Sequence, residues 1–268
     1  VGSEMCIRDR FLIEAEEYLN FYAEKFGQYP WIEEKFGLVH TPYLGMEHQT
    51  INAYGNNYKK TKRGYDFILF HEAGHEWWGN YISVADWSDF WIHEGICTYA
   101  ESMYIEEKFG LESAKNFIDE RFKKNITNTA PIVPERNSNA NLESGNDVYY
   151  KGAHALHMLR YIIGKETLWA SLKEYLQMPK ELPDNQTSTD EFISLIEENS
   201  GMKLDWFFNQ YFFKKELPTL KKLEKTINNK KYVDLWWEEV DFKMPVEINY
   251  FSFDGKRYKK LDLDNKPK

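Results

Sequence analysis

The chain has 268 residues, with 34 Lys and Arg and 43 Asp and Glu, so its formal net charge is −9. This acidic balance argues against general nucleic-acid binding, because such binding relies on clustered basic side chains. Hydrophobic residues make up 42% and aromatic residues 17% of the chain, which excludes disorder as its overall state, and no apolar run reaches the roughly 18 residues of a transmembrane segment. The two cysteines, Cys6 and Cys97, are too few for a disulfide framework and leave the cellular compartment open.

The first ten residues differ from those that follow. Residues 1–10 mix Gly, Ser, Cys and charges without periodicity and resemble a translated sequencing adapter, so we interpret them as a non-native leader. From Phe11 to Phe26, apolar residues recur every three or four positions, which predicts a helix that ends at Gly27.

The middle of the chain reads as mainly helical. Short apolar runs between Gly, Pro and Asn predict strands and loops over residues 36–58. Ser188 and Glu191 have the spacing of a capping box, and residues 127–147, rich in Asn, Ser and Pro, predict a long surface loop. Helical patterns occupy residues 66–80, 90–108, 152–163, 166–176, 189–199 and 204–213.

The pattern changes from Pro218 onward, where strand-like runs rich in Tyr, Val and Trp replace the helical period. Asn228-Asn229 and Asp254-Gly255 separate such runs and predict hairpin turns. We therefore expect a boundary near residues 214–218, followed by three or four strands of a β-module.

The stretch 71–75 reads His-Glu-Ala-Gly-His. Residues four apart share one helix face, so the imidazoles of His71 and His75 can reach one metal ion, and Glu72 can face a water on that ion. A catalytic zinc site needs a third protein ligand. Glu94 is the candidate, because the 18 residues between His75 and it allow a helix to end and an antiparallel helix to return.

A chance match on an ordinary amphipathic helix is the alternative, because the pattern of two His and one Glu is only moderately specific. The flanking residues favour zinc. Trp-Trp-Gly-Asn follows at 77–80, and Glu94 lies within a Trp-Ile-His-Glu-Gly stretch at 91–95.

These stretches resemble the gluzincin aminopeptidases, the family of aminopeptidase N and leukotriene A4 hydrolase. The resemblance implies one Zn²⁺ per chain, held by His71, His75 and Glu94, with Glu72 as the general base. It implies a mainly α fold with a small β-sheet: a thermolysin-like catalytic domain plus helical subdomain over 11–214, then the start of a β-sandwich module over 215–268. It also implies that an upstream β-domain of the intact protein is missing.

An exopeptidase needs a group that binds the free α-amine of its substrate. Leu-Gly-Met-Glu-His at 44–48 resembles the Gly-Ala-Met-Glu-Asn motif of the family, with substitutions at three positions. The resemblance implies that Glu47 binds the ammonium group, from an edge strand that includes Gly45, and that Met46 lines the first side-chain pocket. A solvated loop carboxylate is the alternative for Glu47.

Tyr-Tyr-Lys-Gly at 149–152 resembles the Tyr-x-Lys-Gly motif of the family. The resemblance implies that Tyr149 donates its hydroxyl to the oxyanion of the reaction. A packed core tyrosine is the alternative, and Tyr150 is the neighbour that a shift of one residue would select.

Other polar residues near these motifs are weaker candidates. Glu101 can orient a histidine ligand or belong to a solvated face. We interpret His93 as structural, His154 and His157 as packing or surface residues, and Cys97 as a small buried apolar residue.

The resulting prediction is a zinc aminopeptidase that acts on peptides with a free N-terminus, with no nucleic-acid partner. Three alternatives remain. The first is a thermolysin-like zinc endopeptidase, which would lack the amine anchor. The second is an epoxide hydrolase like leukotriene A4 hydrolase, which no motif demands, and the third is a non-catalytic scaffold on the same fold.

Overall fold

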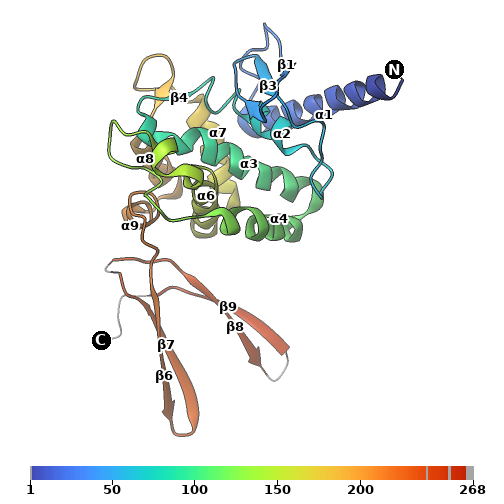
Figure 1. The fold of residues 1–268 in the computed structure, drawn as a ribbon. Coiled ribbons are helices and arrows are strands. Elements are labelled where there is room, and N and C mark those ends of the chain that lie inside the picture. Colours follow the sequence, from blue (N-terminus) through green and yellow to red (C-terminus); the bar gives the residue numbers. More distant parts are fainter. Residues whose placement is uncertain (1, 240, 253–254, 264–268) are drawn as a thin grey trace.

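Helices α2 (Phe67–Gly74) and α3 (Trp91–Phe109) lie at the centre of a helical body (residues 2–213), and two β-hairpins extend from its lower end as a tail (residues 218–263) (Figure 1). This computed structural model describes residues 2–239, 241–252 and 255–263. Around the central pair lie α1 (Gly2–Phe26), α4 (Leu111–Phe117), α5 (Ala140–Glu143), α6 (Tyr150–Ile163), α7 (Lys165–Gln177), α8 (Thr189–Ser200) and α9 (Asp205–Tyr211). Within the described residues, no helix is long and apolar enough to cross a bilayer.

Most predicted helices are confirmed, with two changes of length. Helix α1 covers the predicted range from Phe11 and begins earlier, at Gly2, inside the segment interpreted as a leader. The helix predicted over 66–80 ends at Gly74, because the backbone then turns and the amide of Asn80 donates to the carbonyl of His75 at 2.9 Å. The capping box is half formed: the Ser188 hydroxyl accepts from the amide of Glu191 at 3.3 Å.

The prediction of a plain surface loop over 127–147 is wrong in part. This segment contains α5, and a 3-10 turn (Gly145–Val148) leads into α6. Ile132 and Val133 are buried, and the amide of Val133 donates to the carbonyl of Phe212 at 3.0 Å. Sparse apolar residues anchor this segment, and the turn that it forms carries Tyr149 to the site.

A three-stranded sheet covers one side of α2. Its order is β1 (Gly37–His40), β3 (Ile51–Tyr54), β2 (Gly45–Met46), with β1 parallel and β2 antiparallel to β3. Strand β2 is therefore an edge strand among the described residues, as predicted. A two-stranded parallel sheet, β4 (Ser83–Val84) with β5 (Gln186–Thr187), joins the loop after α2 to the start of α8.

Aromatic side chains fill the core between α1 and α2. Tyr22 stacks on Trp77 with ring centroids 5.4 Å apart, and its hydroxyl donates to the carbonyl of Phe70 at 3.1 Å. A Cβ on Gly74 would lie 2.4 Å from that hydroxyl, so only glycine lets α1 approach α2 this closely. The core thereby fixes the helix that carries the two histidines.

The tail consists of two antiparallel hairpins, β6 (Leu220–Ile227) with β7 (Lys230–Trp237) and β8 (Val246–Ser252) with β9 (Gly255–Leu261). The first turn is confirmed: Asn228 and Asn229 have φ of 50° and 58°, as a two-residue hairpin turn requires. In the second predicted turn, Asp254 lies outside the described residues. The mainly α class with small sheets is confirmed, whereas the two hairpins do not pair with each other in the described part of the tail.

Candidate metal centre

Helix α2 presents two histidines on one face. Its N-cap is Asp66, whose side chain accepts from the amide of Leu69 at 3.3 Å and from the amide group of Asn56 at 2.7 Å. His71 lies in the last turn, and His75 follows the helix in right-handed helical geometry, so the two imidazoles keep the four-residue spacing.

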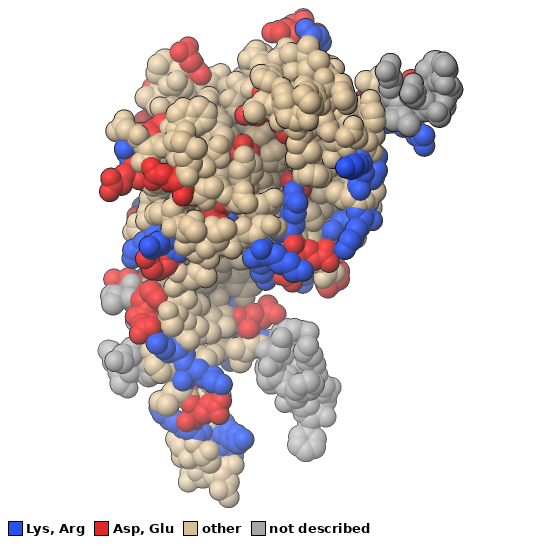
Figure 2. Space-filling view, viewed as in Figure 1, with Lys and Arg blue, Asp and Glu red and all other residues tan. Residues whose placement is uncertain are grey.

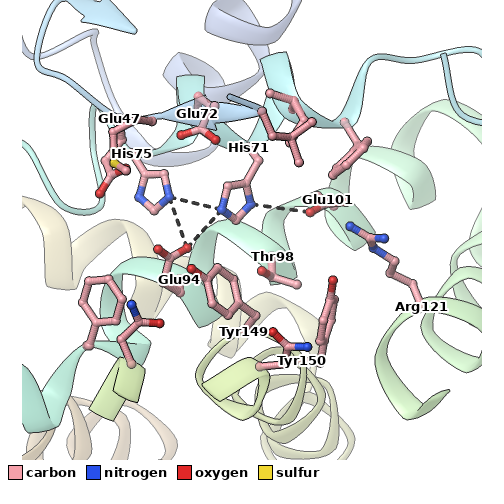
Figure 3. A pocket seen from close by; sticks show the side chains of 18 of the residues that line it. Glu47, His71, Glu72, His75, Glu94, Thr98, Glu101, Arg121, Tyr149 and Tyr150 are labelled. Carbon is pink, nitrogen blue, oxygen red and sulfur yellow. Dashed lines mark hydrogen bonds and ion pairs between the residues drawn. The ribbon is translucent and has the colours of Figure 1, made fainter. Parts of the chain in front are cut away.

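Three donor atoms from these residues and Glu94 converge. The Nε2 atoms of His71 and His75 are 3.2 Å apart, and they lie 3.1 and 3.3 Å from Oε2 of Glu94 (Figure 3). Tetrahedral zinc holds its ligands at roughly 2.0–2.1 Å, which places ligand atoms about 3.3 Å from one another. The three donors therefore have the spacing of three corners of a zinc tetrahedron.

A second group of possible ligands overlaps the first. Glu47, Glu72 and His75 also offer atoms within 4.8 Å of one another. That set has one imidazole, whereas catalytic zinc is commonly held by two histidines and a carboxylate. The chemistry of the donors thus favours His71, His75 and Glu94.

Each histidine is oriented by its other ring nitrogen. Nδ1 of His75 donates to the carbonyl of Trp78 at 2.9 Å, which leaves Nε2 free to bind a metal. Nδ1 of His71 lies 3.6 Å from Glu101, whose other carboxylate oxygen accepts from the Tyr65 hydroxyl at 3.2 Å. Glu101 is buried, so the solvated-face alternative is wrong and the orienting one is supported.

Electrostatics in the site favour a bound cation. Burial lowers the pKa of His71, but the carboxylates of Glu101 and Glu94 outweigh burial and raise it to about 10. Burial raises the pKa of Glu94, but His75 and His71 hold it well below its usual range. The carboxylates of Glu94 and Glu101 thus stabilise positive charge at the imidazole nitrogens, whether a proton or a metal ion carries it.

Glu72 points into the same cavity without joining the three donors (Figure 3). It is 8% exposed, and burial raises its pKa to about 7, although His71 and His75 act in the opposite direction. A Cβ on Gly45 would lie 2.4 Å from its Oε1. The glycine of edge strand β2 therefore gives room to the Glu72 carboxylate.

Glu47 directly follows β2 and is half-buried at the wall of the cavity. Its carboxylate lies on the His75 side of the metal centre, at the opposite end from Arg121 (Figure 3). Met46 lines the same cavity and is 44% exposed, and Gly45 lines it as well. The Glu47 side chain is therefore partly shielded from solvent, unlike the solvated loop carboxylate that was the alternative.

The two tyrosines of the Tyr-Tyr-Lys-Gly motif face different neighbours. Tyr149 stacks on His71 with ring centroids 6.1 Å apart, and burial, followed by the charge of Glu94, raises its pKa. Tyr150 instead lies under the Arg121 guanidinium, 5.4 Å from its ring centroid. The geometry therefore brings Tyr149, not Tyr150, to the three donor atoms.

Two glycines explain how Tyr149 reaches Glu94. A Cβ on Gly95 would lie 3.3 Å from Cα of Gly152 and 3.0 Å from the carbonyl oxygen of Val148. Helices α3 and α6 therefore cross almost backbone to backbone, at the glycines of the Trp-x-x-Glu-Gly and Tyr-x-Lys-Gly motifs. The remaining motif residue, Lys151, donates to the backbone carbonyls of residues 214 and 215 at 3.3 and 3.4 Å.

Sequence reasoning missed two carboxylates that position the site. Glu76 accepts from the amide of Thr50 at 2.9 Å and from Asn52 at 3.1 Å, which ties the sheet to the segment after His75. Asp147 accepts from the amide of residue 127 at 2.7 Å and so holds the turn before Tyr149. Only long-range contacts reveal these roles, although Asp147 lies two residues before a recognised motif.

The remaining histidines lie away from the three donors. His93 is buried, and its Nε2 accepts from the amide of Val84 at 3.1 Å, which confirms a structural role. His154 and His157 are half-buried on α6, and burial lowers the pKa of each to about 4. Cys97 is a buried free thiol beside Nδ1 of His75, in agreement with the expected packing role.

Comparison with known proteins identifies similar chains. The family model described as the peptidase family M1 domain matches residues 12–211. The glutamyl aminopeptidase of Bitis rhinoceros is 26% identical over 181 residues, 62% of this chain and 18% of that protein. Aminopeptidase B of Homo sapiens is 26% identical over 194 residues, 66% of this chain and 30% of that protein.

A solved structure shares the fold. The M1 zinc metallopeptidase from Deinococcus radiodurans superposes with a TM-score of 0.64 at 22% identity, covering 77% of this chain and 45% of that chain. The present chain thus spans less than a third of the two curated relatives and less than half of the solved structure.

Proposed function

The chain belongs to the M1 peptidase family, whose cofactor is zinc, and we propose that it is an aminopeptidase that removes the N-terminal residue from peptides. One observation carries this proposal: three donor atoms with zinc spacing share a cavity with a carboxylate that follows an edge strand. The similar proteins named aminopeptidases support the same activity.

His71, His75 and Glu94 would hold the zinc, and their donors fit it in type and spacing. Bound zinc supplies Lewis-acid polarisation of the scissile carbonyl and a lowered pKa for water. Glu72 takes the proton of the attacking water and returns it to the leaving amine. Tyr149 donates its hydroxyl to the oxygen on which negative charge develops.

Glu47 restricts the reaction to the chain end. Its carboxylate accepts a charge-assisted hydrogen bond from the substrate ammonium, while the substrate backbone extends along β2. Gly45 lies against Glu72, and carboxylate oxygens of Glu47 and Glu72 lie within 4.8 Å of each other, so the amine anchor and the base are neighbours in the cavity. Met46 then faces the side chain of the residue that is removed.

The layout of the whole protein belongs to this proposal as well. We infer a thermolysin-like catalytic domain with a helical subdomain over 11–214, and a β-sandwich module to which 215–268 contributes its first strands. Nothing favours the thermolysin-like endopeptidase, the epoxide hydrolase or the non-catalytic scaffold over an aminopeptidase.

The test compares a peptide that has a free N-terminus with its N-acetylated form, using the zinc-loaded chain. We expect release of the first residue from the free peptide and none from the blocked one, with Glu47→Ala raising KM for the free peptide. Efficient cleavage of the acetylated peptide at an internal bond would contradict the aminopeptidase and support an endopeptidase.

A further inference from the structure

A second cavity adjoins the metal-centre cavity. The first has a volume of about 660 Å³ and the second about 410 Å³, and Phe67, Glu101 and Arg121 line both. The two cavities therefore meet at Arg121, and we call them together the groove. The first extends from Glu47 past the metal centre to Arg121 (Figure 3), and the second adjoins it there.

Arg121 is held in place in the wall of this groove by aromatic rings. Its guanidinium lies 4.8 Å from the ring centroid of Phe67 and 5.4 Å from that of Tyr150. Among the described residues, no carboxylate comes within 4 Å of it. Glu101 also lines both cavities, but its two oxygens face His71 and Tyr65.

A guanidinium in this state is ready to bind an anion. Stacking on rings restricts the side chain, so little conformational entropy remains to be lost when a carboxylate binds. The planar fork of Arg suits two parallel hydrogen bonds to a carboxylate. The missing ion-pair partner is then most simply a group of the substrate.

The rest of the second cavity is also basic, although the chain as a whole carries a net charge of −9. Lys62 and Lys124 line its exposed rim, and Arg63 is paired with Glu120 at 3.4 Å. Figure 2 shows Lys and Arg side chains gathered beside the hollow of the helical body. This end of the groove is therefore positive, whereas the opposite end carries Glu47.

This polarity matches the direction of a bound peptide. If the ammonium group lies at Glu47 and the scissile bond at the metal centre, the residues that leave must extend toward Arg121. We propose that Arg121 and the basic cavity behind it bind a carboxylate on the leaving part of the substrate, from an acidic side chain or from the C-terminus of a short peptide. The direction of the peptide rests on the proposed function, but the presence of a carboxylate site does not.

The experiment measures peptide binding to the zinc-loaded chain carrying Glu72→Gln, by titration calorimetry, so that hydrolysis does not interfere. The neutral peptide is X-Gly-Gly amide, where X is the preferred first residue. Three comparison peptides each carry one carboxylate: two have Glu in place of the first or the second Gly, and one has a free acid in place of the terminal amide. We expect at least one carboxylate peptide to bind about 10-fold more tightly than the neutral one, as a hydrogen-bonded charge pair would give. The responding peptide shows which carboxylate is bound.

Variants assign this preference to Arg121. Arg121→Gln should remove the preference and leave the neutral peptide unchanged, and Arg121→Lys should retain part of it. Lys115→Gln, an exposed charge on α4 outside the groove, is the matched control and should keep the preference. Equal binding of all peptides to the parent chain, or uniform weakening by Arg121→Gln, would overturn the proposal.

Hydrolysis of an X-4-nitroanilide separates this inference from the proposed function. That compound has an amine and a cleavable bond but no carboxylate beyond it. Its hydrolysis by the chain without Glu72→Gln tests the aminopeptidase alone. If the nitroanilide is hydrolysed but the neutral and carboxylate peptides bind with equal affinity, the proposed carboxylate site is wrong and the proposed aminopeptidase activity is supported.

Discussion

The helical body and the β-hairpin tail differ in what holds their residues in place. In the body, residues far apart in sequence are locked together: Trp91 is fully buried and donates to Thr189 at 2.8 Å. In the tail, each strand pairs with its hairpin neighbour, and apolar side chains such as Ile227 and Val233 are 51% and 52% exposed. The candidate site lies in the body, where contacts between distant parts of the sequence hold its side chains in place.

The tail joins the body through a small aromatic contact. Phe242 is buried, and its ring centroid lies 5.3 Å from that of Trp206 and 5.7 Å from that of Tyr211. Lys260 donates to the carbonyl of Tyr161 at 3.3 Å. Substitutions at the far ends of the hairpins should therefore leave the metal-centre cavity unchanged. Within the body, loss of a single functional group of the site should change zinc binding or hydrolysis.

The largest effect is expected at Glu94. Glu94→Ala removes one of three donors and the charge that balances two imidazoles, so zinc should be lost on dialysis and hydrolysis should fall to background. Atomic absorption of the dialysed protein measures the metal, and circular dichroism tests folding. Retention of one zinc per chain by the folded variant would show that Glu94 is not a ligand.

Tyr149→Phe should follow in size. One oxyanion donor contributes about 10²–10³ in turnover, so kcat should fall by that factor while KM and zinc content change little. Tyr150→Phe keeps the ring over which Arg121 lies and is the matched control. A large loss only in Tyr150→Phe would mean that the other hydroxyl faces the reacting carbonyl.

Glu101→Gln probes the carboxylate behind His71 and should have a smaller effect. Loss of a carboxylate that orients a histidine ligand typically costs about 10–100-fold in metal affinity. Competition with a chelator of known affinity measures this change directly. An unchanged zinc affinity would show that the 3.6 Å approach of Glu101 to His71 has no influence on the metal.

The smallest effect is expected in the tail. Val233→Ser replaces a half-exposed side chain on β7, so hydrolysis and zinc content should stay within about twofold of the parent chain. A body variant measured beside it, such as Tyr149→Phe, sets the scale. A tenfold loss of activity in Val233→Ser would mean that the tail takes part in the site.

Local patterns explain what the sequence predicted well. Helical periodicity predicted α3, α6 and α8, and the Asn228-Asn229 pair predicted the first hairpin turn, because each depends on neighbouring residues alone. Four-residue spacing likewise predicted that His71 and His75 share a face. In the structure, the three helices, the Asn228-Asn229 turn and the shared face of His71 and His75 all agree with these local patterns.

Tertiary packing explains what the sequence did not predict. The helix expected to reach residue 80 stops at Gly74, because the aromatic core and the bonds of Glu76 fix a turn there. The groove at Arg121 has no motif, since it is formed by rings and charges from separate elements. The Gly95–Gly152 crossing shows why two motifs each end in glycine, but only once both helices are in place.

Zinc content and hydrolysis, measured together in Glu72→Gln, show whether Glu72 is the base or a metal ligand. The amide has the size of the carboxylate that Gly45 accommodates, so the fold of the site should persist. General-base catalysis contributes about 10²–10⁴ in rate. We predict one zinc per chain in both proteins and a loss of hydrolysis of at least that order in the variant. Loss of zinc from Glu72→Gln would mean that Glu72 is a metal ligand, and undiminished hydrolysis with zinc bound would mean that it is not the base.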